Sequence, residues 1–183
     1  GKSKGLELIY APIQESNMSR PLSQFTKPVV IGTTKEEGNI YIRNESRKLS
    51  PERFVEVMTL NDIHLHISQA QTGKDQARMV TTHYFETPAI SFLNQLDNNP
   101  HCWKLRFDWC LSNASPFQSA YHILDLVFWF GKLEILKAHG VNSLEHERHL
   151  SKHMIDDLIY FATYHTMPWP SYSPQTPYCY IYK

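Results

Sequence analysis

The sequence has few cysteines, few glycines and no surplus of either charge, and each shortage excludes a class of protein. Three cysteines without a Cys-x-x-Cys pair argue against a disulfide framework or a zinc ribbon. Seven glycines form neither a Gly-x-Gly-x-x-Gly nor a Walker pattern, which argues against nucleotide-dependent enzymes. Eighteen basic residues balance eighteen acidic ones, so we expect no electrostatically driven binding of nucleic acid or of an anionic membrane.

Long apolar runs and a leader-like start are also missing. The longest apolar run, residues 126–130, is too short to cross a bilayer, so we expect no transmembrane segment. Without a signal-peptide pattern we expect an intracellular protein, cytoplasmic or nuclear. The nucleophile pattern Gly-x-Ser-x-Gly does not occur, which argues against nucleophilic catalysis, and we expect no cofactor.

Several segments have the patterns of β-strands. Strict alternation predicts a strand at residues 103–109, whose aromatic and aliphatic side chains share one face. Alternation at residues 63–68 and the β-branched and aromatic run 78–85 predict an antiparallel pair of strands. Residues 29–31 and 39–43 predict a hairpin with Gly38 in its loop.

Three hydroxyl-proline pairs predict helix starts, because the hydroxyl caps the helix and proline fits its first turn. These pairs are Ser50-Pro51, Thr87-Pro88 and Ser115-Pro116. Residues 117–130 are apolar nearly all round and predict a helix packed on several sides. Residues 144–165 have helical periodicity, with Ser143 as the expected N-cap. Periodicity does not decide between helix and strand for residues 133–136.

Together these elements predict a single α+β domain with a mainly antiparallel sheet packed against three to four helices. The domain would span residues 29–166, after a loosely structured arm at 1–28. An aromatic, proline-rich segment at 167–183 would pack on the domain or on a partner. The predicted core consists of the apolar residues on the inner faces of these elements: Ile63, Leu65, Ile67, Trp103, Leu105, Phe107, Trp109, Leu124, Val127, Phe128, Leu150, Met154, Leu158 and Phe161.

One stripe of the last predicted helix carries His146, His149, His153 and Asp157 at spacings of three and four. Histidines at i and i+4 are common zinc ligands on a helix. Lys152 lies beside them, however, and the glutamate of a His-Glu-x-x-His motif is absent. We therefore expect no metal site here, and a polar helix border that uses histidine is the alternative.

The predicted strands offer a second set of candidate metal ligands. His64 and His66 alternate with aliphatic residues on one strand and would face His83 on the neighbouring one. Three histidines on adjacent strands can hold a metal ion. Exposed or hydrogen-bonded histidines on a sheet are the commoner arrangement, so this site remains an alternative.

Two His-x-Ser motifs, His66-Ile67-Ser68 and His149-Leu150-Ser151, resemble the paired motifs of the two-histidine phosphoesterases. The resemblance covers six residues. It implies that one histidine acts as general base and the other as general acid, while the hydroxyls bind phosphate oxygens. An alternative function is therefore a phosphodiester-cleaving or metal-dependent enzyme that uses His66 and His149.

A further alternative is a single-stranded RNA-binding module. Lys104 and Arg106 share one face of the aromatic strand, and Arg78 and Tyr84 share a face of another. If these faces coincide, basic and aromatic side chains form a platform for unpaired bases. The neutral charge favours a sheet whose charged side simply lies in water.

Surplus aromatic residues in the C-terminal segment are the strongest remaining signal. Tyrosine and tryptophan supply the main contacts of many interfaces. The expected interface residues are Trp169, Tyr172, Tyr178, Tyr180 and Tyr182. We therefore predict a non-catalytic interaction or assembly protein with a protein partner or as a homo-oligomer, of a composition typical of virus-encoded structural or host-binding proteins. An edge strand at 178–182 on its own domain is the intramolecular alternative.

Overall fold

The computed structural model describes residues 24–42, 47–96, 99–111 and 116–183. Most of the predicted arm at 1–28, and the predicted helix start at Ser115, lie outside the described residues. None of the described helices is both long and apolar enough to span a membrane.

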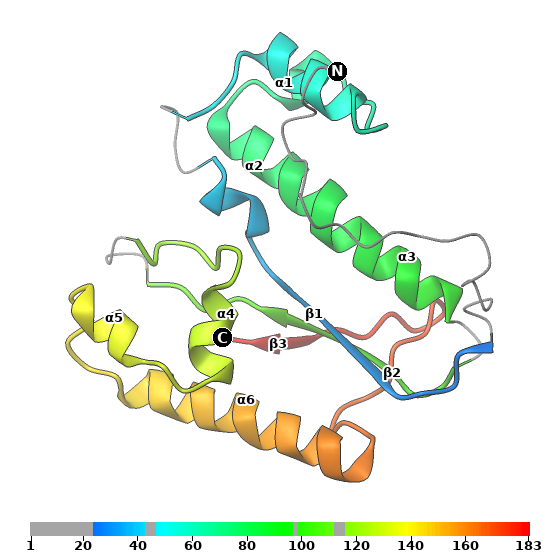
Figure 1. Ribbon diagram of the computed structural model, residues 1–183, viewed down its shortest axis with the longest axis vertical. Coiled ribbons are helices and arrows are strands. Elements are labelled where there is room, and N and C mark those ends of the chain that lie inside the picture. Colours follow the sequence, from blue (N-terminus) through cyan, green and yellow to red (C-terminus); the bar gives the residue numbers. More distant parts are fainter. Residues whose placement is uncertain (1–23, 43–46, 97–98, 112–115) are drawn as a thin grey trace, which may run out of the picture.

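A parallel sheet of three strands forms the centre of the molecule (Figure 1). Its strands are β1 (Val29–Thr34), β2 (Cys102–Phe107) and β3 (Tyr180–Tyr182), in the order β1-β2-β3. The expectation of a mainly antiparallel sheet is wrong. Parallel strands need long crossover connections, and here each connection contains helices rather than a tight turn. The fold is therefore α/β rather than α+β.

The connection from β1 to β2 begins with a short 3₁₀ helix, Glu37–Ile40, where the sequence predicts the loop and second strand of a hairpin. It continues through the helices α1 (Pro51–Thr59), α2 (Gly73–Thr81) and α3 (Thr87–Gln95). The predicted cap of α1 is confirmed, because Ser50 Oγ accepts a hydrogen bond from the N–H of Arg53.

The predicted pair of strands at 63–68 and 78–85 is wrong. The first segment has no regular structure until a 3₁₀ turn at Ile67–Gln69, and the second belongs to α2 and a π-helical turn at Thr82–Glu86, here called the π turn. A reciprocal cap between Thr72 and Asp75 starts α2, and this local signal overrides the strand propensity of the residues that follow. The π turn joins α2 and α3 into one continuous rod (Figure 1).

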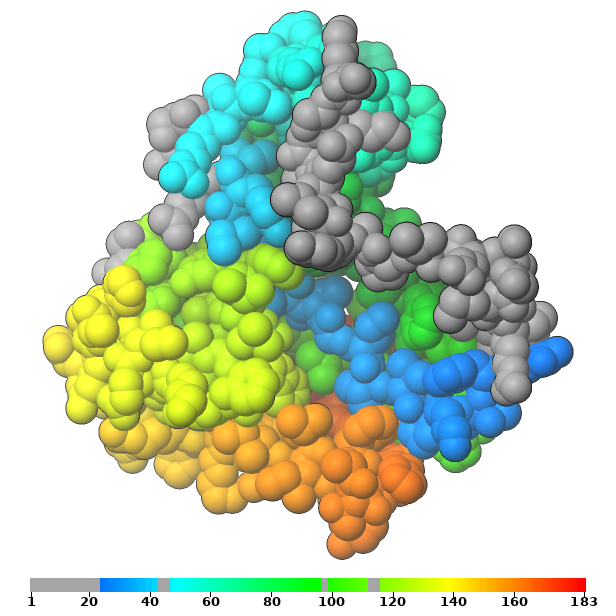
Figure 2. All heavy atoms as spheres, viewed as in Figure 1, coloured from blue at the N-terminus to red at the C-terminus, as the bar shows by residue number. Residues whose placement is uncertain are grey.

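The connection from β2 to β3 contains α4 (Leu124–Trp129), α5 (Glu134–Ala138) and α6 (Glu145–Tyr164). The long helix α6 confirms the periodicity of 144–165, although Ser143 does not cap it. Only the second half of 117–130 is helical, and residues 133–136 enter α5 as helix. In the space-filling view α4, α5 and α6 fill one end of the molecule, and α1 lies at the other (Figure 2).

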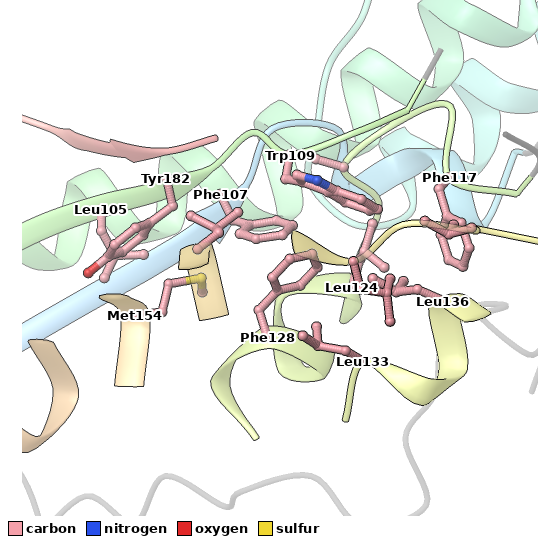
Figure 3. Packing of buried hydrophobic residues seen from close by; sticks show 14 of the residues in the cluster. Leu105, Phe107, Trp109, Phe117, Leu124, Phe128, Leu133, Leu136, Met154 and Tyr182 are labelled. Carbon is pink, nitrogen blue, oxygen red and sulfur yellow. The ribbon is translucent and has the colours of Figure 1, made fainter. Parts of the chain in front are cut away.

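The main core lies between the sheet and α4–α6, where β2 directs alternate side chains toward the helices (Figure 3). Most of the predicted core is buried there, including Phe107 and Phe128, whose ring centroids lie 5.0 Å apart. Two predicted core residues are exposed instead: Ile67 lies in the 3₁₀ turn, and Leu158 lines an open groove beside α6. Ile63, Leu65, Val127 and Phe161 are half-buried.

Candidate active site

The loops that follow β1 and β2 meet at one edge of the sheet. The strands are parallel and in register from Val29 opposite Cys102 to Thr34 opposite Phe107, so their carboxyl ends coincide. The backbone N–H of Lys35 donates to the carbonyl of Phe107, and that of Glu36 donates to the carbonyl of Ala120, both at 2.9 Å. These bonds fasten the loop after β1 to the loop after β2. Ligand and catalytic sites of open α/β sheets form at this edge.

Glu37 and His122 form the central pair of this edge. Nδ1 of His122 lies 2.7 Å from Oε2 of Glu37, although the two residues are 85 positions apart in the sequence. The Glu37 side chain is 5% exposed, and its Oε1 accepts a hydrogen bond of 2.6 Å from the N–H of Thr34. Because a carboxylate accepts, Nδ1–H donates to Glu37 and leaves the lone pair of Nε2 available to take a proton. The His122 side chain is 35% exposed, so a reactant can reach it.

Gly38 fixes the position of Glu37 against α2. A Cβ at Gly38 would lie 2.0 Å from the carbonyl oxygen of Ala77, so only glycine permits this approach. The N–H of Gly38 donates to Oγ1 of Thr81 at 2.9 Å, and Oγ1 of Thr81 donates to the carbonyl of Ala77 at 3.0 Å. The loop after β1 that carries Glu37, here called the acid loop (residues 35–38), is therefore held by α2 as well as by the sheet.

His122 is followed by a strained residue. Ile123 has a φ of +67°, in the left-handed region that β-branched residues rarely adopt. The turn places His122 at the entrance to α4, directly before its first helical residues. Strained conformations of this kind persist where the surrounding structure requires them, and they cluster at functional sites.

Two aromatic rings surround the imidazole. The centroid of Phe85, from the π turn, lies 4.9 Å from that of His122 at an interplanar angle of 50°. The Tyr41 ring lies 6.1 Å from His122 and 6.5 Å from Phe85. His122 therefore contacts a carboxylate at one edge and apolar rings beside it.

A second carboxyl group lies close to the pair. Asp125, in the first turn of α4, borders an apolar groove of about 330 Å³. Burial raises the pKa of the Asp125 carboxyl, and the charge of Glu37 raises it further, while hydrogen bonds from Trp129 and from backbone N–H groups lower it. The Asp125 carboxyl therefore keeps its proton to a higher pH than an exposed aspartate would.

The two His-x-Ser motifs do not form a site. His66 lies at the start of the 3₁₀ turn Ile67–Gln69, and its Nδ1 lies 3.1 Å from Oγ of Ser68. His149 and Ser151 lie on α6, where the buried hydroxyl of Ser151 donates to the carbonyl of Phe128 at 2.7 Å. The predicted strand context of the first motif is absent, and the hydroxyl of the second is already occupied in the core.

The candidate metal ligands are also dispersed. On α6, Nε2 of His153 lies 3.1 Å from Oδ2 of Asp157, while His146 and His149 are exposed. His64, His66 and His83 do not share a sheet, because the segments that carry them are not strands. In the part of the chain that the structure describes, no three potential ligands gather to hold a metal ion.

The predicted RNA platform does not form either. Arg78 pairs with Asp75 on α2, and Tyr84 lies on the π turn rather than on a strand beside Arg106. Arg106 donates to both carboxylate oxygens of Asp108, at 2.6 and 2.8 Å. The basic residues are therefore divided between a helix and a strand, and two of them are neutralised by acidic neighbours.

The aromatic C-terminal segment packs on its own chain. Trp169, Tyr172 and Tyr182 are buried, and Nε1 of Trp103 donates to the carbonyl of Trp169 at 3.2 Å. The alternative of a C-terminal strand is confirmed for Tyr180–Tyr182, which pairs with β2. Tyr178 is exposed, and Tyr180 is half-buried.

The chain is similar to known proteins in sequence and in structure. Residues 11–180 match the model of the carboxylesterase family. The para-nitrobenzyl esterase of Bacillus subtilis (strain 168) is 26% identical over 160 residues, which are 81% of this chain and 32% of the esterase. A solved PNB esterase superposes with a TM-score of 0.69 at 25% identity, covering 85% of this chain and 34% of its own. A thermophilic PNB esterase shares the fold, with a TM-score of 0.72 at 24% identity and the same coverage.

The chain thus spans about a third of the length of these relatives. The similarities correct the expectation of a non-catalytic, virus-encoded assembly protein, since they point to a hydrolase. They equally contradict the phosphodiester-cleaving or metal-dependent enzyme and the RNA-binding module. The absence of Gly-x-Ser-x-Gly does not exclude nucleophilic catalysis, because the groups of one catalytic site can come from distant parts of a fold.

Sequence reasoning missed both residues of the central pair. Glu37 falls in the predicted hairpin loop and His122 within a predicted continuous helix. One signal was available: an acid follows the β-branched run that becomes β1, and a histidine follows the aromatic strand that becomes β2. The order acid then histidine is that of α/β-hydrolase triads.

Proposed function

The chain belongs to the carboxylesterase family, and from this premise we propose that it supplies the acid and the general base of a serine-type ester hydrolase. Its fold is the α/β-hydrolase fold of that family, with a parallel sheet. The observation that carries the proposal is the 2.7 Å contact between Glu37 and His122 at the carboxyl ends of adjacent parallel strands. The carboxylate of Glu37 orients the imidazole, and Nε2 of His122 is the general base.

The reaction follows from the atoms of this pair. Nε2 takes the proton of a serine hydroxyl as the serine oxygen attacks the ester carbonyl carbon, and the buried carboxylate of Glu37 stabilises the imidazolium. His122 then returns the proton to the departing alcohol, which leaves an acyl-serine. In the second half, His122 takes a proton from water as the water oxygen attacks the acyl carbon. It then returns this proton to the serine oxygen, which releases the carboxylic acid and regenerates the free serine.

The serine must come from elsewhere in the fold. In α/β hydrolases the nucleophile precedes the acid and the histidine in the chain. Within the described residues, the one hydrogen bond of the His122 ring is that to Glu37. Since no Gly-x-Ser-x-Gly occurs in these 183 residues, we assign the nucleophile to a part of the family fold that this sequence does not span.

Carboxylic esters are the proposed substrate class. The Bacillus subtilis relative is called a para-nitrobenzyl esterase, so a para-nitrobenzyl ester is the first substrate to test. Hydrolysis should be measured with the natural polypeptide that contains these residues, and with its His122→Ala and Glu37→Gln variants. We expect His122→Ala to lower kcat about 10⁶-fold and Glu37→Gln to lower it about 10⁴-fold.

Two matched controls use the exposed histidines that the sequence analysis proposed. His66→Ala and His149→Ala remove an imidazole of the same kind away from the pair, and they should leave kcat within about two-fold of the parent value. Absence of ester hydrolysis by the parent protein contradicts the proposal. So does a His122→Ala variant that keeps more than half of the parent kcat.

A further inference from the structure

The π turn at Thr82–Glu86 is the one interruption in the rod of α2 and α3. The N–H of Thr87 donates to the carbonyl of Thr82, five residues earlier, instead of four as in an α-helix. Such turns insert one extra residue, shift the angular phase of the helix and occur frequently at functional sites.

Two consecutive aromatic residues of the π turn contact different parts of the molecule. Tyr84 packs against the small core formed by α1 and α2. Phe85, the next residue, directs its ring to His122, with the centroids 4.9 Å apart. The backbone of the turn thus connects a structural core on one side with the imidazole on the other.

The single hydrogen bond that the described residues make with the His122 ring leaves the imidazole free to tilt, and neighbouring rings can restrict this tilt. The hydrogen bond from Nδ1 to Glu37 fixes one point of the imidazole, and the ring can still tilt about that bond. The Phe85 ring lies beside the imidazole at an angle of 50° to it. The Tyr41 ring, which follows the acid loop in the sequence, lies near both rings. A tilt toward Phe85 would drive the imidazole against the phenyl ring.

We propose that Phe85 is a positioning residue for His122, which holds the plane of the imidazole so that Nε2 faces the nucleophile while Nδ1 stays on Glu37. This rests on the proposed function, because the tilt of the ring affects the rate only if His122 transfers the proton. The phenyl ring of Phe85 itself neither donates nor accepts a proton. Misplacing a catalytic group by about 1 Å can lower a rate about 10²-fold, so a loosened imidazole has a measurable effect.

The test compares variants of Phe85 in the natural polypeptide, with a para-nitrobenzyl ester as substrate. Phe85→Leu keeps an apolar side chain without a flat ring, and we expect kcat to fall about 10-fold to 100-fold while KM stays within about two-fold. Phe85→Tyr keeps the ring and should retain at least half of the parent kcat. Tyr84→Leu is the matched control: it alters the same turn on its other side and should lower Tm but not kcat.

Two results overturn the proposal. One is a Phe85→Leu variant with the parent kcat; the other is an equal loss of kcat in Phe85→Leu and Tyr84→Leu, which would indicate general damage to the turn. The His122→Ala variant separates this inference from the proposed function. If His122→Ala abolishes hydrolysis and Phe85→Leu does not affect it, only the positioning role fails; if His122→Ala remains active, the proposed function fails.

A second measurement does not depend on turnover. The ring current of Phe85 shifts the proton resonances of the His122 imidazole, and Phe85→Leu should remove that shift while Phe85→Tyr keeps it. Unchanged His122 resonances in Phe85→Leu would show that the ring does not contact the imidazole in solution, and would contradict the inference.

Discussion

The hydroxyl of Tyr182 on β3 donates a hydrogen bond of 2.7 Å to Oδ2 of Asp157 on α6. Both side chains are buried, and Nε2 of His153 approaches the same oxygen at 3.1 Å from the exposed side. Tyr182 is thus joined to β2 through strand pairing and to the longest helix through its side chain. The contact fastens the last strand to the main core.

Tyr182→Phe should lower the free energy of unfolding by about 1.5 to 3 kcal/mol, because it removes a hydrogen bond to a buried charged group. Urea unfolding measures the change. His153→Ala is the control at the same carboxylate: its side chain is 51% exposed, so its loss should cost less than about 1 kcal/mol. Equal effects of the two substitutions would contradict the importance of the tyrosine hydroxyl.

The same contact predicts a pH dependence. Burial, and then the hydrogen bond and charge of Asp157, raise the pKa of Tyr182 above its ordinary value of 10.0. Above about pH 10 the unfolded chain therefore releases this proton while the folded chain keeps it, so stability falls as the pH rises. The stability difference between the parent protein and Tyr182→Phe should shrink by about 1.4 kcal/mol per pH unit there. A difference that stays constant from about pH 9 to 11.5 would contradict the raised pKa.

Gly38→Ala should damage the candidate site more than the core. The new Cβ would need to occupy space 2.0 Å from the carbonyl oxygen of Ala77, so the acid loop must move away from α2. We expect a loss of about 2 kcal/mol or more in stability, and a fall in ester hydrolysis as Glu37 is displaced. Gly32→Ala on β1 is the control, because the nearest atoms to its new Cβ belong to the side chain of Leu105 rather than to backbone. It should cost less stability and leave hydrolysis closer to the parent value.

Ile123→Gly should separate stability from activity. The left-handed backbone at φ +67° costs a β-branched residue about 1 to 3 kcal/mol, which glycine does not pay. Part of this gain is offset by the greater freedom of glycine in the unfolded chain, so we expect a net stabilisation of about 0.5 to 1 kcal/mol. Thermal unfolding checks this, with Ile123→Val, which keeps the β-branch, expected to show no gain. Ester hydrolysis should fall in the glycine variant, because the backbone that carries His122 becomes freer.

The sequence predicted elements whose signals are local. The aromatic alternation at 103–109 predicts β2, the Ser50-Pro51 pair predicts the start of α1, and the long periodicity at 144–165 predicts α6. Pairing is a different problem. The partner of Val29–Thr34 is Cys102–Phe107, and no local pattern indicates that these distant strands lie side by side and parallel.

The candidate site depends on that pairing. Glu37 and His122 are 85 positions apart and come together only because both follow neighbouring parallel strands. The sequence predicts an antiparallel sheet in which these two strands are not paired with each other, and the histidines of α6 form the denser cluster along the chain. The cluster of histidines along one helix therefore indicates the candidate site less well than the position of single residues after the parallel strands.

The rod of α2 and α3 reaches both halves of the pair: Thr81 holds the backbone next to Glu37, and Phe85 lies against His122. A small slide or rotation of this one rod would shift the acid and the base in the same event. A substitution that displaces the rod should therefore lower ester hydrolysis even where the sheet and its core stay folded. A single helical element therefore connects the positions of the proposed acid and the proposed base.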